Sequence, residues 1–248
     1  MISRYAIAPC TMHHAPCTPH LAPRTLHLAR CTLNVGGVVL ALGILSSSQA
    51  TAQLGSIDLR GGVMGYFSER STTLDGDAGR GSGTLAGVEL AARSKFVGAS
   101  ARLFGGSFSA EVGDEAVGDI GRIDLSVLAG PSYISGELGY ALRSFTGAFG
   151  TRRWSFVRLG GQSTLPLGST GLHASVSAAV YLGVSASHNT GNGSGRDLET
   201  RLTYTASSLP LYAALGYRFE RFTADDATDT RPEEMSGVVL VVGARLKI

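Results

Sequence analysis

The residue pair most suggestive of catalysis is His173 and Ser175, which are separated by one alanine. On an extended strand, residues two apart project from the same face, so the imidazole and the hydroxyl would lie close together. A serine nucleophile needs such a base, and the base needs an acid to orient it. No acidic residue occupies a compelling third position. We therefore expect an interior histidine and no enzyme, with a lipid hydrolase acting through this pair as the alternative.

A second chemical feature is the recurrence of charged residues of both signs near the middle of otherwise apolar segments. In a narrow closed structure such charges must pair in the interior. Arginine suits this role because its planar guanidinium binds a carboxylate through two parallel hydrogen bonds. We predict a lumen charge network made of Arg60, Glu89, Arg102, Arg122, Asp124, Glu137, Arg143, Arg158, Arg201, Arg218 and Glu220.

The segments that carry these residues alternate apolar and polar side chains with a period of two, which is typical of strands with two different faces. The clearest example has an apolar residue at every even position from Leu172 to Ala186. No segment shows a convincing amphipathic helix pattern. About ten such runs occur, at 56–67, 82–93, 96–108, 119–130, 133–144, 153–165, 170–187, 197–206, 209–222 and 235–248.

The connections between these runs differ in length. Those at 69–82, 109–118, 188–196 and 223–234 are long, whereas those at 94–96, 130–132, 165–169 and 207–209 are short. The pattern indicates an up-and-down antiparallel barrel of about ten strands (eight or twelve are alternatives), with large loops at one end and turns at the other. The four prolines after residue 52 fall in connections or at a strand start, as proline's missing N–H requires; they are Pro131, Pro166, Pro210 and Pro232.

The first part of the chain differs from the rest. All three cysteines lie within residues 1–31, an apolar stretch follows at about 38–45, and Ala50-Thr51-Ala52 has the form of an export cleavage site. We predict a leader and secretory signal peptide over 1–52 and a barrel domain over 53–248. Residues 1–30 exceed an ordinary signal start, and a start codon assigned too early would explain them.

The apolar face of each strand meets either lipid or a soluble core. Runs of 10 to 15 residues match the ~9–11 residues that cross a bilayer at a tilt, whereas soluble strands are usually about 5–6 residues long. Faces rich in alanine and glycine suit lipid, which needs no interlocking side chains. The alternative is a soluble, exported barrel of lipocalin type with the apolar face inward.

On these features the chain resembles the small bacterial outer-membrane β-barrels, the class of the OmpA membrane domain, OmpX and the opacity proteins. The resemblance covers about residues 55–248 and is one of architecture. It implies a Gram-negative outer membrane, periplasmic termini, contact with outer-membrane lipid and assembly by the barrel-assembly machinery. The chain ends in Ile248, where the class typically has an aromatic residue. His173 and Ser175 likewise resemble the His-x-Ser pair of outer-membrane lipid A deacylases.

Ten basic and six acidic residues are predicted on the inward faces. They are the eleven residues of the charge network together with Arg93, Arg245, Lys247, Asp58 and Glu199. We expect a structural or surface-interaction protein with long external loops, an unidentified external ligand and a blocked lumen; a narrow anion-leaning pore or small-solute transporter is the alternative. No cofactor, no metal site and no nucleic-acid partner are expected, and the acids around Asp75 and Asp77 are interpreted as solvated. Aromatic girdles are expected from Phe67, Phe104, Phe108, Trp154 and Phe219 at the loop end and from Phe96, Tyr133 and Tyr204 at the turn end.

Overall fold

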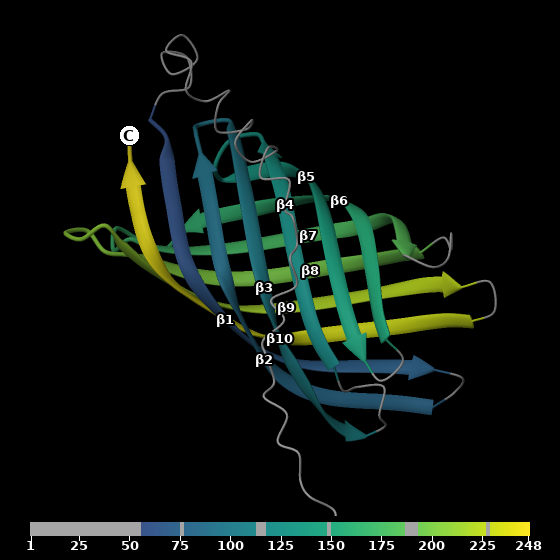
Figure 1. Ribbon diagram of the computed structural model, residues 1–248. Helices are drawn as coiled ribbons and strands as arrows, with labels where there is room; N and C mark the ends of the chain where they lie inside the picture. The colour runs from purple at the N-terminus through teal and green to yellow at the C-terminus, as the bar shows by residue number, and fades with distance from the viewer. Residues whose placement is uncertain (1–55, 75–76, 113–117, 148–149, 187–192, 227–228) are drawn as a thin grey trace, which may run out of the picture. The chain divides into compact units, whose positions relative to one another are not determined.

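In the computed structural model, ten antiparallel strands close into one barrel (Figure 1). The structure describes residues 56–74, 77–112, 118–147, 150–186, 193–226 and 229–248, so the predicted leader lies outside the described residues. No helix in these ranges is long and apolar enough to cross a membrane. The strands are β1 (Asp58–Leu74), β2 (Asp77–Arg93), β3 (Val97–Val112), β4 (Gly118–Ala129), β5 (Ile134–Gly147), β6 (Gly150–Pro166), β7 (Leu172–Ala186), β8 (Gly193–Thr205), β9 (Leu211–Asp226) and β10 (Asp229–Lys247).

Each strand pairs with its neighbours in sequence, and β1 also pairs with β10. Val63 shows the closure, because its register partners are Val88 on β2 and Val242 on β10. Closure gives every described strand a neighbour on both sides. In Figure 1 the strands β2 to β5 run steeply across β8 to β10, as tilted strands on opposite walls of a barrel do. The predicted ten-stranded, all-β, up-and-down barrel is therefore confirmed.

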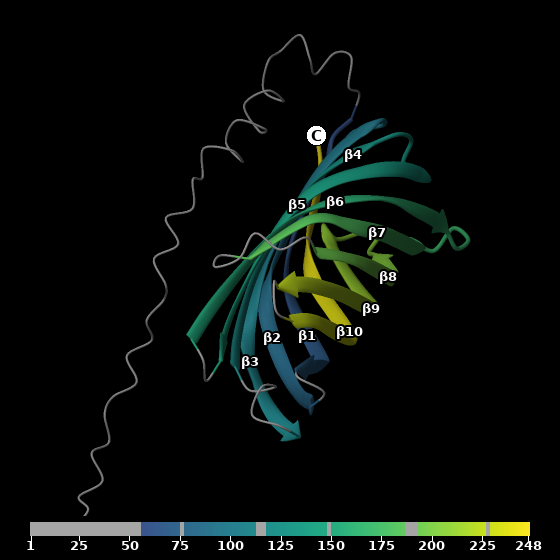
Figure 2. The ribbon, with the colours of Figure 1, turned by 90° about the vertical axis from the view of Figure 1, so that its right-hand side faces the viewer.

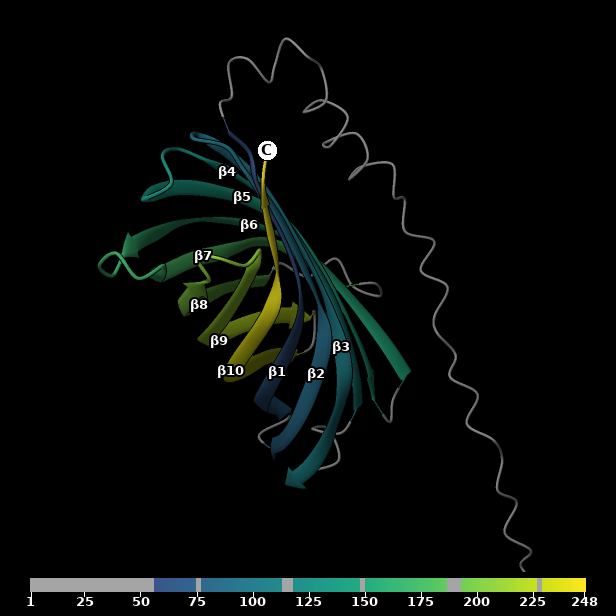
Figure 3. The ribbon, with the colours of Figure 1, turned by 90° about the vertical axis from the view of Figure 1, so that its left-hand side faces the viewer.

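The two ends of the barrel differ. At one end, here called the terminal end, Ile57 and Ile248 exchange backbone hydrogen bonds of 2.8 and 2.9 Å. Figures 2 and 3 show the C-terminus beside the first residues of β1. The connections at this end are 94–96, 130–133, 167–171 and 206–210, so the short turns are found where the sequence predicts them. The opposite end is here called the distal end.

Two of the four long loops predicted at the distal end are wrong, because the structure continues as strand through most of each segment. In the segment 69–82, β1 continues to Leu74 and β2 starts at Asp77. In the segment 223–234, β9 continues to Asp226 and β10 starts at Asp229. The residues are polar, glycine-rich or charged, yet the antiparallel ladder supplies their backbone hydrogen bonds without needing apolar partners. These two segments are therefore extended hairpins, whereas the central residues of the predicted loops 109–118 and 188–196 lie outside the described residues.

Pro232 accordingly lies inside β10 and not in a connection. It pairs with Thr223 on β9, whereas the ladder between β10 and β1 begins only at Glu233. On that side Pro232 has an edge-strand environment, where the missing N–H costs no ladder bond.

Apolar residues that alternate along every strand face outward. Val63 is 66% exposed, and the belt continues around the barrel through residues such as Val88, Leu103, Val127, Leu159, Val180, Leu198, Leu215 and Leu240. The residues between them face inward and are largely buried, among them Arg122, Arg218 and Glu220. The barrel is thus apolar outside and charged inside, the reverse of a soluble barrel that holds an apolar ligand.

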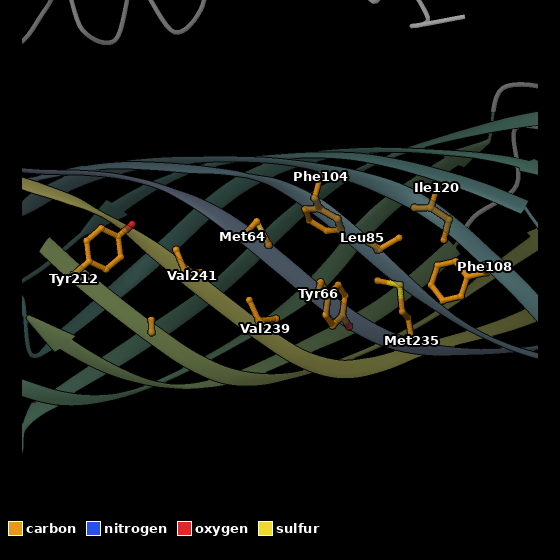
Figure 4. Close-up of a cluster of buried hydrophobic side chains, with 11 residues drawn as sticks. Met64, Tyr66, Leu85, Phe104, Phe108, Ile120, Tyr212, Met235, Val239 and Val241 are labelled. Atoms are coloured by element: carbon orange, nitrogen blue, oxygen red, sulfur yellow. The ribbon is translucent and has the colours of Figure 1, made fainter. Parts of the chain in front are cut away.

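Part of the lumen is nevertheless apolar. Met64, Tyr66, Leu85, Phe104, Phe108, Ile120, Tyr212, Ala214, Met235, Val239 and Val241 form one cluster on the walls made by β9, β10 and β1 to β4 (Figure 4). Phe104, Phe108 and Trp154 are buried in the interior, so their assignment to an outer aromatic girdle is wrong. They share the inward parity of charged neighbours such as Arg102 on β3 and Arg158 on β6. Phe67, at 54% exposure, does face outward.

Glycine makes room for this cluster. A Cβ at Gly87 on β2 would lie 2.1 Å from the carbonyl oxygen of Leu103 and 2.5 Å from Cβ of Phe104. Gly87 therefore allows β2 and β3 to approach closely, with the Phe104 ring lying inward.

Candidate functional site

The candidate site is the lumen, whose charged side chains form layers between the two ends of the barrel. The layer nearer the terminal end contains Glu89 on β2, Arg102 on β3, and Glu199 and Arg201 on β8. Arg102 reaches Glu89 at 2.8 Å and Glu199 at 2.6 Å, while Arg201 reaches the same two carboxylates at 2.8 and 2.7 Å. We call these four residues the floor, because they link β2 and β3 to β8 across the lumen.

The next layer toward the distal end is larger, and we call it the seal. Its seven members are Arg122 and Asp124 on β4, Glu137 on β5, Arg158 on β6, Asp197 on β8, and Arg218 and Glu220 on β9. The side chains of all seven are at most 6% exposed. These charges lie too deep for water to solvate them, so they depend on one another.

Two arginines join opposite walls within the seal. Arg122 reaches Asp124 at 2.7 Å and also forms an ion pair with Glu220 on the facing strand β9. Arg218 lies 2.7 Å from Asp197 and 3.3 Å from Asp124. Each arginine thus bridges carboxylates on two strands far apart in the barrel, which fixes the distance between the walls.

A third arginine extends the seal to β5 and β6. The Nη1 atom of Arg158 lies 2.9 Å from Glu137, and its Nη2 atom lies 2.8 Å from Asp197. Ser126 donates a hydrogen bond of 2.6 Å to the same Glu137 carboxylate. Every acid of the seal therefore has at least one arginine partner.

Closer to the distal end, Arg143 on β5 and Arg70 on β1 both bind Glu233 on β10, at 2.8 and 2.6 Å. Aromatic rings occupy the remaining space. The Trp154 and Phe222 rings meet edge to face at a centroid distance of 4.7 Å, and Phe156 lies 4.4 Å from the Tyr181 ring. Charged layers, ring pairs and most of the apolar cluster thus line the described lumen between the floor and the distal end.

Between the floor and the terminal end the lumen widens into a cavity of about 1000 Å³, here called the vestibule. Its innermost surface includes the floor residues Arg102 and Arg201. At its mouth, Arg245 holds Asp58 through two hydrogen bonds of 2.9 and 2.8 Å, and Arg60 holds the same carboxylate at 3.0 Å.

The structure places the eleven predicted network residues at four levels of the lumen. Glu89, Arg102 and Arg201 lie in the floor, and Arg60 lies at the vestibule mouth. Arg143 lies toward the distal end. The remaining six, Arg122, Asp124, Glu137, Arg158, Arg218 and Glu220, all lie in the seal.

Four charged residues that line the described lumen were missed, and one of them, Lys95, lies in the short turn 94–96. Asp197 is the first residue of the predicted strand 197–206, and it has the same parity as Glu199 and Arg201. Arg70 and Glu233 belong to segments read as loops. Extending the period of two from Arg60 through position 70 would have identified Arg70 as an inward residue.

His173 and Ser175 both line the vestibule, and no hydrogen bond joins their side chains in the described structure. The Nδ1 atom of His173 lies 3.2 Å from the carbonyl oxygen of Gly171, and Ser175 donates to the carbonyl oxygen of Arg201 at 3.4 Å. Both side chains thus contact backbone, and no acid orients the imidazole in the structure. Within the described ranges no cluster of His, Cys, Asp or Glu has the form of a metal site. Asp75 lies outside the described residues.

Neither protein-family models nor curated proteins give a match to this chain. Among solved structures, the chain is similar to the translocator domain of the autotransporter NalP from Neisseria meningitidis, with a TM-score of 0.43, 12% identity, and coverage of 85% of this chain and 97% of that chain. OmpT, an outer membrane protein of Vibrio cholerae, gives a TM-score of 0.30, 7% identity, and coverage of 69% and 63%. The TodX monoaromatic hydrocarbon channel gives a TM-score of 0.27 and 9% identity, with coverage of 77% of this chain and 90% of that chain. Likenesses this distant carry no argument about what this chain does.

Proposed function

We propose that this chain is an integral outer-membrane β-barrel with a closed lumen, acting as a structural or surface-interaction protein that presents its distal end outside the cell. The observation that carries the proposal is the combination of a continuous apolar exterior with an ion-paired interior. Only an apolar solvent stabilises such an exterior, and only a closed barrel satisfies every backbone group within it.

The closed lumen is supported by the floor and the seal. Both layers join opposite walls, and the buried arginines of the seal each contact two carboxylates. A narrow anion-leaning pore would need a continuous water path past these pairs. We assign no catalytic step, because His173 and Ser175 contact backbone atoms and lack an acid. The expected partners are outer-membrane lipid and the barrel-assembly machinery.

Orientation is the part of the proposal that the sequence makes easiest to test. The chain has only two lysines, Lys95 and Lys247, and both lie at the terminal end. With periplasmic termini, a membrane-impermeant amine reagent should leave the protein unlabelled in intact cells and label it once the outer membrane is permeabilised.

A matched control is Arg221→Lys, which places an amine on an exposed position of β9 near the distal end. This variant should be labelled in intact cells. Labelling of the wild-type protein before permeabilisation would reverse the orientation. Recovery of the protein in the aqueous fraction without detergent would refute membrane insertion and favour the soluble, lipocalin-like alternative.

A further inference from the structure

Among the side chains that the structure describes, the surplus of positive charge inside the barrel lies in the vestibule. The floor contains two arginines and two glutamates. From the seal to the distal end, five arginines face five acids: Arg70, Arg122, Arg143, Arg158 and Arg218 against Asp124, Glu137, Asp197, Glu220 and Glu233. Counted over the described side chains, both regions are therefore neutral. The vestibule beyond the floor has a single carboxylate, Asp58, for five cations: Arg60, Arg93, Lys95, Arg245 and Lys247.

Arg93 shows the imbalance most directly. Its Nη2 atom donates to the carbonyl oxygens of Gly130 and Pro131 at 2.9 and 3.1 Å, and its Nη1 atom lies 3.4 Å from the hydroxyl of Ser135. Its Nε atom is buried and has no acceptor among the described residues. These partners are neutral, so the guanidinium keeps its full charge at the cavity wall.

The backbone is arranged to place Arg93 there. Gly98 on β3 is its register partner, and a Cβ at this position would lie 2.7 Å from Cδ of Arg93. The glycine lets the arginine cross β3 and reach the turn between β4 and β5. Arg60 and Arg245 are also fixed, in their case by ion pairs with the carboxylate of Asp58. These three arginines are thus held in place before any ligand arrives.

We propose that the vestibule is a binding site for a small polyanion with two or more carboxylate or phosphate groups. Guanidinium groups bind both oxyanions through paired hydrogen bonds, and a cavity of about 1000 Å³ admits a molecule of that size. Hydroxyl groups of Ser100, Ser177 and Thr203 line the same cavity and suit an oxygen-rich ligand. The neutral floor closes the inner end, so the ligand enters and leaves at the terminal end.

Entry of the ligand into the vestibule from the periplasm rests on the proposed orientation, but binding of the ligand does not. The test is therefore calorimetric titration of the detergent-folded protein, with citrate as the carboxylate probe and inorganic pyrophosphate as the phosphate probe. Both should bind with an affinity that falls as salt rises. The probe that binds more tightly identifies the preferred oxyanion.

The variant Arg60→Gln removes surplus charge and leaves the Asp58–Arg245 pair intact. Losing hydrogen bonds to a charged group should weaken binding by about 10- to 100-fold. Arg221→Gln makes the same charge change outside the vestibule and should leave the affinity unchanged. Folding of each variant is checked by a heat-dependent gel shift, so a misfolded variant is not mistaken for a binding defect.

If neither probe binds folded wild-type protein, or if Arg221→Gln weakens binding as much as Arg60→Gln does, the vestibule is not an anion site. Those results would leave the membrane assignment intact. Conversely, lysine labelling in intact cells would overturn the orientation without affecting the calorimetric result.

Discussion

Replacing Arg122 by methionine should destabilise the barrel far more than the loss of an ordinary ion pair. The Arg122 side chain is fully buried and binds Asp124 at 2.7 Å, Glu220, and the Tyr181 hydroxyl at 3.2 Å. After its removal, the nearest arginine atom to Glu220 is Nη1 of Arg143 at 3.9 Å. Breaking a buried pair and leaving one charge uncompensated costs about 3–5 kcal/mol.

The matched control is Arg60→Gln at the vestibule mouth. The Arg60 side chain is 34% exposed and makes an ion pair of 3.0 Å with Asp58, which keeps its bond to Arg245. Its guanidinium also lies 6.0 Å from the centroid of the Tyr212 ring. Exposed pairs contribute about 0.2–1 kcal/mol. The two variants each remove one arginine from the barrel interior, yet their free energies of unfolding should differ by at least about 2 kcal/mol.

The assay is equilibrium urea unfolding in lipid vesicles, followed by the fluorescence of the single tryptophan. Trp154 is buried against Phe222 and should report loss of the lumen packing. The double variant Arg122→Met with Glu220→Met removes both charges, so it should be more stable than Arg122→Met alone. If Arg122→Met unfolds within about 1 kcal/mol of the wild type, the seal does not hold the walls together as argued.

Three further predictions concern the exterior, the close strand approach and the vestibule. Leu159 lies on the outer face beside Arg158 of the seal, and Leu159→Arg should lower the free energy of unfolding in vesicles by about 2–4 kcal/mol. Leu246→Arg, near the terminal end, should lower it by only about 0–1 kcal/mol. Equal losses of stability in a urea titration would contradict a lipid-facing belt. Gly87→Val should sharply reduce the folded band on a heat-modifiability gel. The control Gly65→Ala should fold normally, because a Cβ there meets only Phe67, at 3.8 Å. A fully folded Gly87→Val protein would show that β2 and β3 can separate. Asp58→Asn should raise the affinity for pyrophosphate, because it frees Arg60 and Arg245, and a calorimetric titration that shows weaker binding would argue against these two arginines as ligands.

The period of two, read together with the short turns, predicted the barrel and the two faces of each strand. It works because the pleat alternates every side chain, and charges such as Arg122 and Arg218 cannot be placed in lipid. Trp154 and Phe156 occupy the positions that alternate with the apolar face of their strand, and the structure places both side chains in the lumen. Their hydrophobicity suggests the outside, but ring packing in a narrow lumen is an equally good environment.

The lengths of the strands were not predictable in the same way. Polar segments such as the one around Arg70 read as loops because turn-forming residues dominate them, yet a hairpin continues wherever its backbone ladder can. The ion-pair partners across the lumen could not be predicted from the sequence either. Arg102 and Glu199 are 97 residues apart, and their contact depends on strand number, tilt and register together. Sequence alone therefore placed the charges inside without showing that they form separate layers.

The vestibule illustrates the same limit. The sequence showed an interior excess of basic residues, which is compatible with a pore along the whole lumen. The structure shows that the excess lies on one side of the floor, at residues such as Arg93 and Arg245. The distribution of the charge, and not its total, is therefore the basis for proposing a closed lumen with a binding cavity.

The measurement that tests the central proposal most directly is single-channel recording in planar bilayers. The protein is inserted in the folded state shown by its heat-dependent gel shift, and a conducting porin serves as the positive control. With the floor and the seal intact, the wild-type barrel should produce no discrete conductance steps. Reproducible steps whose frequency rises with the amount of folded protein would contradict the closed lumen and establish a pore.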